Sequence, residues 1–236
     1  MPSKYQIISE LAVQKAAEVS SGAKPYMAFL ETAAANYKYS FKEQLLIYAQ
    51  RPDATALAEI GTWNKLGRWV NKGAKGIALL VENDPKNRLR HVFDISDTNS
   101  YYGNDITPWQ MKARYEDAVI EALRNRFGEI ADYGDFAESI SGIADLVVED
   151  NISDYAEMLK SVKGGSLLEE LDEDNTSMWL KTALKNSVAF MMLTRCGYNA
   201  RRYFSAEDFS RVCDFNTPDT GCHRYRTSPS GSSEHT

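Results

Sequence analysis

Hydrophobic residues in the first fifty positions recur at the spacing of amphipathic α-helices, and three helices are predicted there. In the first, apolar side chains repeat every three or four positions until Gly22. Pro25 marks the first turn of the second helix, a position where proline is well tolerated. The third covers residues 41–50 and ends before Pro52.

The period of the pattern changes after a further short helix, which is predicted near residues 56–66. The apolar run at 77–81 is typical of a buried strand, and residues 89–95 alternate as a returning strand would. Turn-forming residues at 83–87 separate the two runs, so an antiparallel hairpin is expected. Whether residues 69–70 add a third strand stays open. The predicted fold class is therefore α+β, with the N-terminal helices packed on a small antiparallel β-sheet.

The second half of the chain is predicted to be an all-α helical domain. Helical periodicity covers residues 111–127, 135–148, 153–161, 166–171, 175–196 and 205–213. A polar stretch with glycine and proline precedes these segments, which places a boundary between a first domain at 1–107 and a helical domain at 108–215. Residues 216–236 end in a run rich in serine, threonine and glycine without aliphatic residues, so this tail is expected to be disordered.

Charge is strongly segregated along a chain whose formal net charge is −6. Between positions 62 and 91 seven basic residues stand against two acidic ones, a balance of +5, with Trp63 and Trp69 among them. Between positions 116 and 174 seventeen acidic residues stand against four basic ones, a balance of −13. Because salt screens charges beyond about 8 Å at physiological ionic strength, a basic face can act beside an acidic body.

Cations interleaved with large aromatic side chains suit a single-stranded nucleic acid, since phosphates need charge and unstacked bases need flat faces. The basic residues that fit this role are Lys65, Arg68, Lys72, Lys75, Arg88 and Arg90. Arg68, Lys72 and Lys75 also flank glycines, where backbone N–H groups can approach phosphate oxygens. The alternative is that Trp63 and Trp69 belong to the core and the lysines only solubilise a hairpin edge.

Residue patterns for catalysis and for metal binding are missing from the sequence. Cys213 and Cys222-His223 have no zinc-site spacing. No nucleophile elbow, phosphate-binding Gly-Lys-Ser/Thr loop or His-Glu-Xaa-Xaa-His motif occurs. We therefore predict a protein that is not an enzyme and uses no cofactor or metal ion. The N-terminus lacks signal-peptide features and no apolar run reaches the roughly 18 residues of a membrane span, which favours a cytoplasmic location.

Residues 63–98 resemble the N-terminal domain of the antirestriction protein ArdC family. The resemblance rests on the run WNKLGRWVNKGAKGIALL, the strand VFDISDT and the upstream segment NYKYSFKEQLLIYAQRPDATA. More widely, residues 1–220 resemble the start of large helicase and methylase proteins of Firmicute conjugative elements, through motifs such as GSLLEELDEDN and SVAFMMLTRCGYNA. The helicase and methylase regions, and the metalloprotease domain of ArdC-like proteins, are absent, so a truncated N-terminal fragment is expected.

The resemblance implies that residues 1–107 bind single-stranded DNA, in mobile-element transfer or in protection of incoming DNA. Its matching positions are Trp63, Lys65, Arg68, Lys72, Lys75 and Gly76. We predict non-enzymatic, largely sequence-independent binding, with bases stacked on Trp69, Tyr101 or Tyr102. One alternative is a protein-interaction scaffold, in which the acidic helical half docks a partner or other domains of a longer parent protein. Another is a degenerate fragment without a present function.

Overall fold

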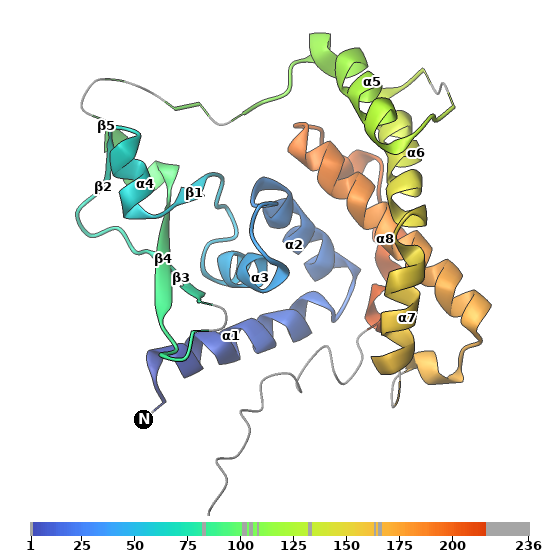
Figure 1. Cartoon of the computed structure of the whole chain (residues 1–236), viewed down its shortest axis with the longest axis horizontal. Helices are drawn as coiled ribbons and strands as arrows, with labels where there is room; N and C mark the ends of the chain where they lie inside the picture. Colours follow the sequence, from blue (N-terminus) through green and yellow to red (C-terminus); the bar gives the residue numbers. More distant parts are fainter. Residues whose placement is uncertain are drawn as a thin grey trace, which may run out of the picture.

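The computed structural model describes residues 2–81, 84–100, 103, 106–107, 109–131, 134–162, 164 and 167–215. Helices dominate this part of the chain, and two small antiparallel sheets accompany them, which confirms the predicted α+β class (Figure 1). The predicted tail at 216–236 and two of the candidate stacking residues, Tyr101 and Tyr102, lie outside the described residues.

The predicted N-terminal helices are present as α1 (Lys4–Val19), α2 (Ala23–Ala35) and α3 (Phe41–Gln50). Two of them begin with a capping box. In α1, the Ser3 hydroxyl accepts a hydrogen bond from the backbone N–H of Gln6 at 3.2 Å, and the Gln6 side chain accepts one from the backbone N–H of Ser3 at 2.7 Å. Ser40 and Glu43 form the same motif in α3. These contacts satisfy N–H groups that a helix start otherwise leaves unpaired.

A three-stranded antiparallel sheet with the order β1–β4–β3 contains β1 (Leu57–Ala58), β3 (Ile77–Leu80) and β4 (Leu89–Asp94). Strands β3 and β4 form the predicted hairpin, with Ile77 opposite Val92 and Leu80 opposite Leu89. Every residue of β3 is buried, as its continuous apolar run predicts. The hairpin is therefore the part of the sheet that local sequence specifies.

The remaining strands differ from the prediction. The helix expected over residues 56–66 starts too early, because Leu57 and Ala58 pair with the end of β4, and α4 covers only Ile60–Lys65. Trp69 and Val70 do lie in a strand, β2 (Arg68–Val70). It pairs with β5 (Thr98–Ser100) in a separate two-stranded sheet and does not extend the hairpin. A 3₁₀ turn, η1 (Ile95–Asp97), joins β4 to β5.

The second half is helical, as predicted. Its elements are η2 (Ala113–Tyr115), α5 (Glu116–Phe127), α6 (Phe136–Glu149), α7 (Ile152–Val162), η3 (Leu167–Glu170), α8 (Glu173–Arg195), η4 (Ala200–Arg202) and η5 (Glu207–Phe215). The last predicted helix is instead a 3₁₀ segment, although Ser205 and Asp208 interact at its start as a capping motif would. Within the described residues, none of the helices combines the length and the apolar character that a bilayer span requires.

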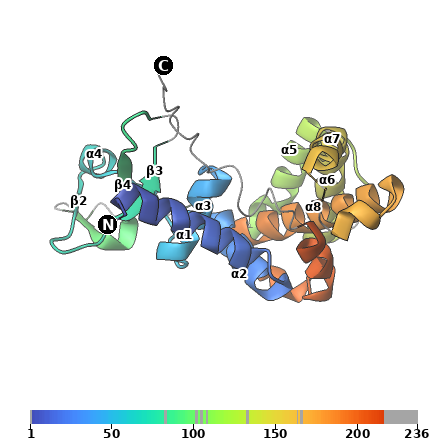
Figure 2. The same cartoon turned by 90° about the horizontal axis from the view of Figure 1, so that it is seen from below.

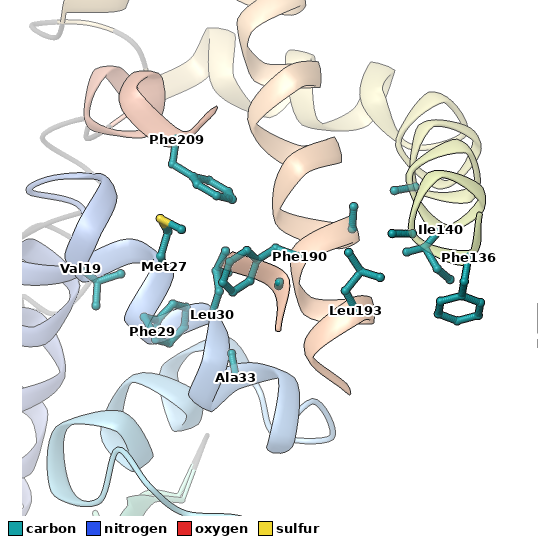
Figure 3. Packing of buried hydrophobic residues seen from close by; sticks show 14 of the residues in the cluster. Val19, Met27, Phe29, Leu30, Ala33, Phe136, Ile140, Phe190, Leu193 and Phe209 are labelled. Carbon is teal, nitrogen blue, oxygen red and sulfur yellow. The ribbon is translucent and has the colours of Figure 1, made fainter. Parts of the chain in front are cut away.

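Helix α2 lies between the two halves of the molecule and contributes to the larger of two hydrophobic cores (Figures 1 and 2). Figure 3 shows Met27 and Leu30 of α2 between Val19 of α1 and Phe190 of α8, with Phe209 of η5 above them. The same core extends to α6. The helices on either side of the predicted boundary at residue 107 therefore share one core, and the division into two domains stays a prediction.

The smaller core packs the sheet against α1 and α3. It consists of Ala12, Leu46, Ile47, Ala54, Ile77, Leu79, Leu80 and Val92. Neighbouring residues of α3 enter different cores, because Leu45 faces the larger cluster whereas Leu46 and Ile47 face the sheet. A helix that is apolar on two sides in this way must be covered on both, which fixes the sheet relative to α2.

Truncation of the shared core should destabilise the whole protein. Phe190 is fully buried and its ring centroid lies 5.7 Å from that of Phe209. We expect Phe190→Ala to lower the free energy of unfolding by about 3–5 kcal/mol, measured by urea denaturation followed by circular dichroism and tryptophan fluorescence. Met178→Ala, on the same helix at a side chain that is 54 % exposed, should change it by less than about 0.5 kcal/mol. Two separate transitions in the wild type would contradict a shared core.

Candidate nucleic-acid interface

A buried carboxylate at the end of β4 holds the strands that carry the basic stretch. The side chain of Asp94 is 2 % exposed and accepts hydrogen bonds from the backbone N–H groups of Thr55 (2.7 Å), Ala56 (3.1 Å) and Ser96 (3.0 Å), and from the Ser96 hydroxyl (2.7 Å). Burial by itself raises the pKa of this carboxyl group, but these donors outweigh it and the pKa of Asp94 is lowered. Asp94 thereby fixes both the segment before β1 and the turn into β5.

Arg68 is part of this framework and is not an exposed cation. Its side chain is 8 % exposed. The guanidinium donates from Nε to the Thr98 hydroxyl at 2.7 Å and from Nη2 to the Thr98 carbonyl at 3.0 Å, which ties β2 to β5. The prediction that Arg68 contacts phosphate is therefore corrected, because its donors already have acceptors inside the protein.

Trp63 and Gly76 are also committed to packing. Trp63 is 3 % exposed, and its indole N–H donates to the Phe93 carbonyl at 3.0 Å, so no ring face is open to a base. For Trp63, the alternative that the tryptophan belongs to the core is therefore confirmed. A Cβ atom on residue 76 would lie 2.8 Å from Cζ of Phe93 and 3.1 Å from Cβ of His91. Glycine therefore has a packing reason at this position, because the chain passes closely over side chains of β4.

The two arginines of β4 and its preceding turn have acidic partners. Arg88 binds Asp84 through Nε at 2.8 Å, and this hydrogen bond is the main reason that the pKa of Asp84 is lowered to about 2. Arg90 binds Glu43 at 2.5 Å and Glu59 at 3.3 Å. The positive charge of each arginine is thus partly compensated by a neighbouring carboxylate, and their predicted phosphate contacts stay predictions.

The lysines of the basic stretch remain available. Lys65 lies at the end of α4, and Lys72 and Lys75 lie in the loop between β2 and β3, with all three exposed. Within the described residues, none of the three ammonium groups forms a hydrogen bond or an ion pair. Lys86, which the predicted site omits, lies in the turn before β4. Its ammonium group is also exposed and, within the described residues, forms no hydrogen bond or ion pair. The sequence signal for the exposure of Lys86 is its position between Pro85 and Asn87, in a segment that is predicted to be a turn.

The loop that presents Lys72 has a defined backbone. The N–H of Ala74 donates to the carbonyl of Asn71 at 3.1 Å, and Gly73 has φ of +90°, as the third position of a type II turn requires. Asn71 is held in turn, because its N–H donates to the Asp97 carbonyl at 2.8 Å and its side chain accepts from Asn99 at 2.7 Å. The lysine at the second turn position is therefore presented from an ordered support.

Trp69 is the remaining described aromatic candidate for base stacking. It is half-buried on β2, opposite Asn99 of β5, and lies three positions from Lys72. Of the predicted site, the exposed lysines are Lys65, Lys72 and Lys75, and Lys86 resembles them in exposure. Among the described residues, no three His, Cys, Asp or Glu side chains are grouped to hold a metal ion.

Substitution should separate the framework arginine from the exposed lysines. We expect Arg68→Ala to lower the free energy of unfolding by about 2 kcal/mol, because it removes charge-assisted hydrogen bonds to Thr98 from a buried site. Lys72→Ala should change it by less than about 0.5 kcal/mol. Urea denaturation of the two variants measures both values. Equal stability of the two variants would contradict the structural role of Arg68.

The Asp94 carboxylate should also make stability depend on pH. A lowered pKa in the folded state means that its contribution is complete above the ordinary value of about 3.9 and is lost as the pH falls through the folded-state value. We expect Asp94→Asn to lower the free energy of unfolding by about 2 kcal/mol at pH 7. The difference from the wild type should shrink below about pH 4. A constant difference in denaturation experiments across this range would contradict the assignment.

Comparison of the chain with protein-family models, with curated proteins and with solved structures finds no match. The resemblance to the ArdC N-terminal domain therefore stays a prediction from the motifs. What remains for a functional argument is the exposure of the lysines before and after β2.

Proposed function

We propose that this chain is a non-enzymatic, single-stranded DNA-binding module of a mobile-element protein concerned with conjugation or antirestriction, acting in the cytoplasm. The single observation that carries the proposal is the placement of Lys65, Lys72 and Lys75. These three exposed cations, without acidic partners among the described residues, lie in the segments on either side of β2, the strand that carries Trp69. The resemblance to ArdC supports the same assignment.

The chemistry of the lysines favours phosphate over base recognition. An ammonium group is a compact point charge on a flexible stem, so it follows a backbone without reading its sequence. Lys72 is exposed in the type II turn, and nothing lies within 4 Å of a Cβ built on Gly73, so the loop backbone is open beside the lysine. Trp69, half-buried on β2, is the described aromatic candidate for stacking an unpaired base, and a duplex has no unpaired base to place there. Preference for single strands follows from this combination.

The alternative of a protein-interaction scaffold is favoured by one other feature. Tyr155 and Met158 of α7 and Met178 of α8 are large apolar side chains exposed to solvent on the acidic helical half. Exposed apolar residues rimmed by charge are typical of interaction surfaces. In this second candidate function, the helical half docks a partner protein and the lysines contact an acidic protein surface.

Removal of the three lysines should abolish most of the DNA binding. We expect the triple variant Lys65→Gln/Lys72→Gln/Lys75→Gln to bind a labelled oligothymidylate far more weakly than the wild type in fluorescence anisotropy. The slope of log affinity against log salt concentration should fall by about 2, since each single-strand phosphate contact contributes roughly 0.7. Duplex DNA of equal length should bind less tightly than the single strand.

A matched triple variant tests whether the position of the charges matters. Lys160→Gln/Lys181→Gln/Lys185→Gln removes the same charge from lysines that are paired with Glu173, Glu149 and Asp145, and it should retain wild-type affinity. Equal loss in both triple variants would indicate nonspecific attraction. Absence of binding by the folded wild type at low salt would leave the scaffold as the better account.

A further inference from the structure

An apolar groove lies between the two halves of the molecule, away from the basic stretch. It has a volume of about 600 Å³ and forms where the end of α2 meets α5, α6 and the last turns of α8. Figure 1 shows these last turns of α8 approaching α2. The residues that line it are Ala34, Tyr37, Trp109, Val119, Leu123, Ile140, Val188, Met191, Met192, Arg195 and Cys196. Its size is within the roughly 300–1,000 Å³ typical of small-molecule sites.

The walls of the groove are almost entirely hydrocarbon and thioether. Leu123 of α5 and Val188 and Met191 of α8 represent this lining. Methionine side chains are flexible and polarizable, so such walls adapt to chains of different shape. A hydrophobic surface of this kind favours an apolar ligand body, and it offers few hydrogen-bond partners to the polar edges of a nucleobase.

One cation lies at the edge of the groove. The guanidinium carbon of Arg195 lies 4.8 Å from the ring centroid of Trp109 and 5.3 Å from that of Tyr37, and each of these aromatic residues is 52 % exposed. The ring faces stabilise the positive charge but accept no conventional hydrogen bond. Within the described residues, the Arg195 side chain donates no hydrogen bond and forms no ion pair.

A guanidinium held in this way is suited to a planar anion. Its N–H groups form a rigid fork that matches the two oxygens of a carboxylate, and the aromatic contacts restrict its motion before any ligand binds. A carboxylate on an apolar body would therefore satisfy both parts of the site at once. A neutral apolar molecule would leave the donors of Arg195 without an acceptor from the ligand.

From this arrangement we infer that the groove binds an amphiphilic monocarboxylate, with the hydrocarbon body among α5, α6 and α8 and the carboxylate on Arg195. The site does not depend on the proposed DNA-binding function, because Lys65, Lys72 and Lys75 are not among its lining residues. The Trp109 and Tyr37 rings lie beside the proposed head-group position, against the Arg195 guanidinium.

Two ligands that differ only in the head group test the inference. Isothermal titration calorimetry with decanoate and with decan-1-ol, each below its aggregation limit, measures their affinities for the full chain. We expect the wild type to bind decanoate more tightly than decan-1-ol. Arg195→Gln should weaken decanoate about tenfold, the loss of one bidentate charge-assisted contact, and change decan-1-ol less than about twofold.

Further variants keep the test decisive. Lys181→Gln removes a positive charge from the same helix outside the groove and should leave both affinities unchanged. Met191→Gln places an amide on the wall and should weaken both ligands, without acting through the head group. Circular dichroism verifies that each variant is folded. The inference is overturned if the folded wild type does not bind decanoate, or if Arg195→Gln weakens both ligands equally. Displacement of decanoate by oligothymidylate would overturn it as well, since the groove would then belong to the DNA-binding surface.

Discussion

The burial of helix α2 on several sides is the constraint on which the rest of the structure depends. Its apolar residues pack against α8, η5 and, through Phe29, against the rings of Phe41 and Tyr48 in α3. Two buried polar groups at its C-terminal end bind the backbone of the segment before β1. The Thr32 hydroxyl donates to the Pro52 carbonyl at 2.6 Å, and the Asn36 amide donates to the Ala54 carbonyl at 3.0 Å. These bonds hold the segment that leads into β1, whose next residues donate to Asp94. The position of the candidate DNA-binding loop is thus set, through Asp94 and β5, by a helix in the centre of the molecule.

Arginine and lysine have different tasks in the basic stretch, and their chemistry explains the division. The planar fork of Arg68 satisfies two acceptors on Thr98, and Arg90 bridges two carboxylates, which a lysine ammonium group would do less well. Lysine has a flexible stem and a strongly hydrated head, so it remains in solvent. The lysines thus carry exposed and uncompensated positive charge, while Arg68 ties β2 to β5 and Arg90 ties β4 to α3 and to Glu59.

Local sequence patterns predict the helices and the β3–β4 hairpin, because each repeats over enough residues to define a period. They do not predict β1, which has two residues, or the pairing of β2 with polar β5, since these depend on Asp94 and on Arg68. The same limit applies to the site. Arg68 and Thr98 are thirty positions apart, so nothing near Arg68 reveals its partner. Arg88 is different, because Asp84 lies four positions away in a predicted turn, and that pairing was within reach of the sequence.

Two neighbouring residues at the end of α2 contact the surroundings of different proposed sites. Asn36 holds the segment before β1, whereas Tyr37 contacts Arg195 at the groove. Coupling between two sites requires an element with two arrangements that each ligand favours differently. Asn36 does not readily adopt a second arrangement, because it is buried and its side-chain amide donates to two carbonyls. These are the carbonyls of Thr32 at 2.9 Å and of Ala54 at 3.0 Å. Movement of Tyr37 can therefore occur without movement of the strands, and this geometry favours two sites that act independently on one core.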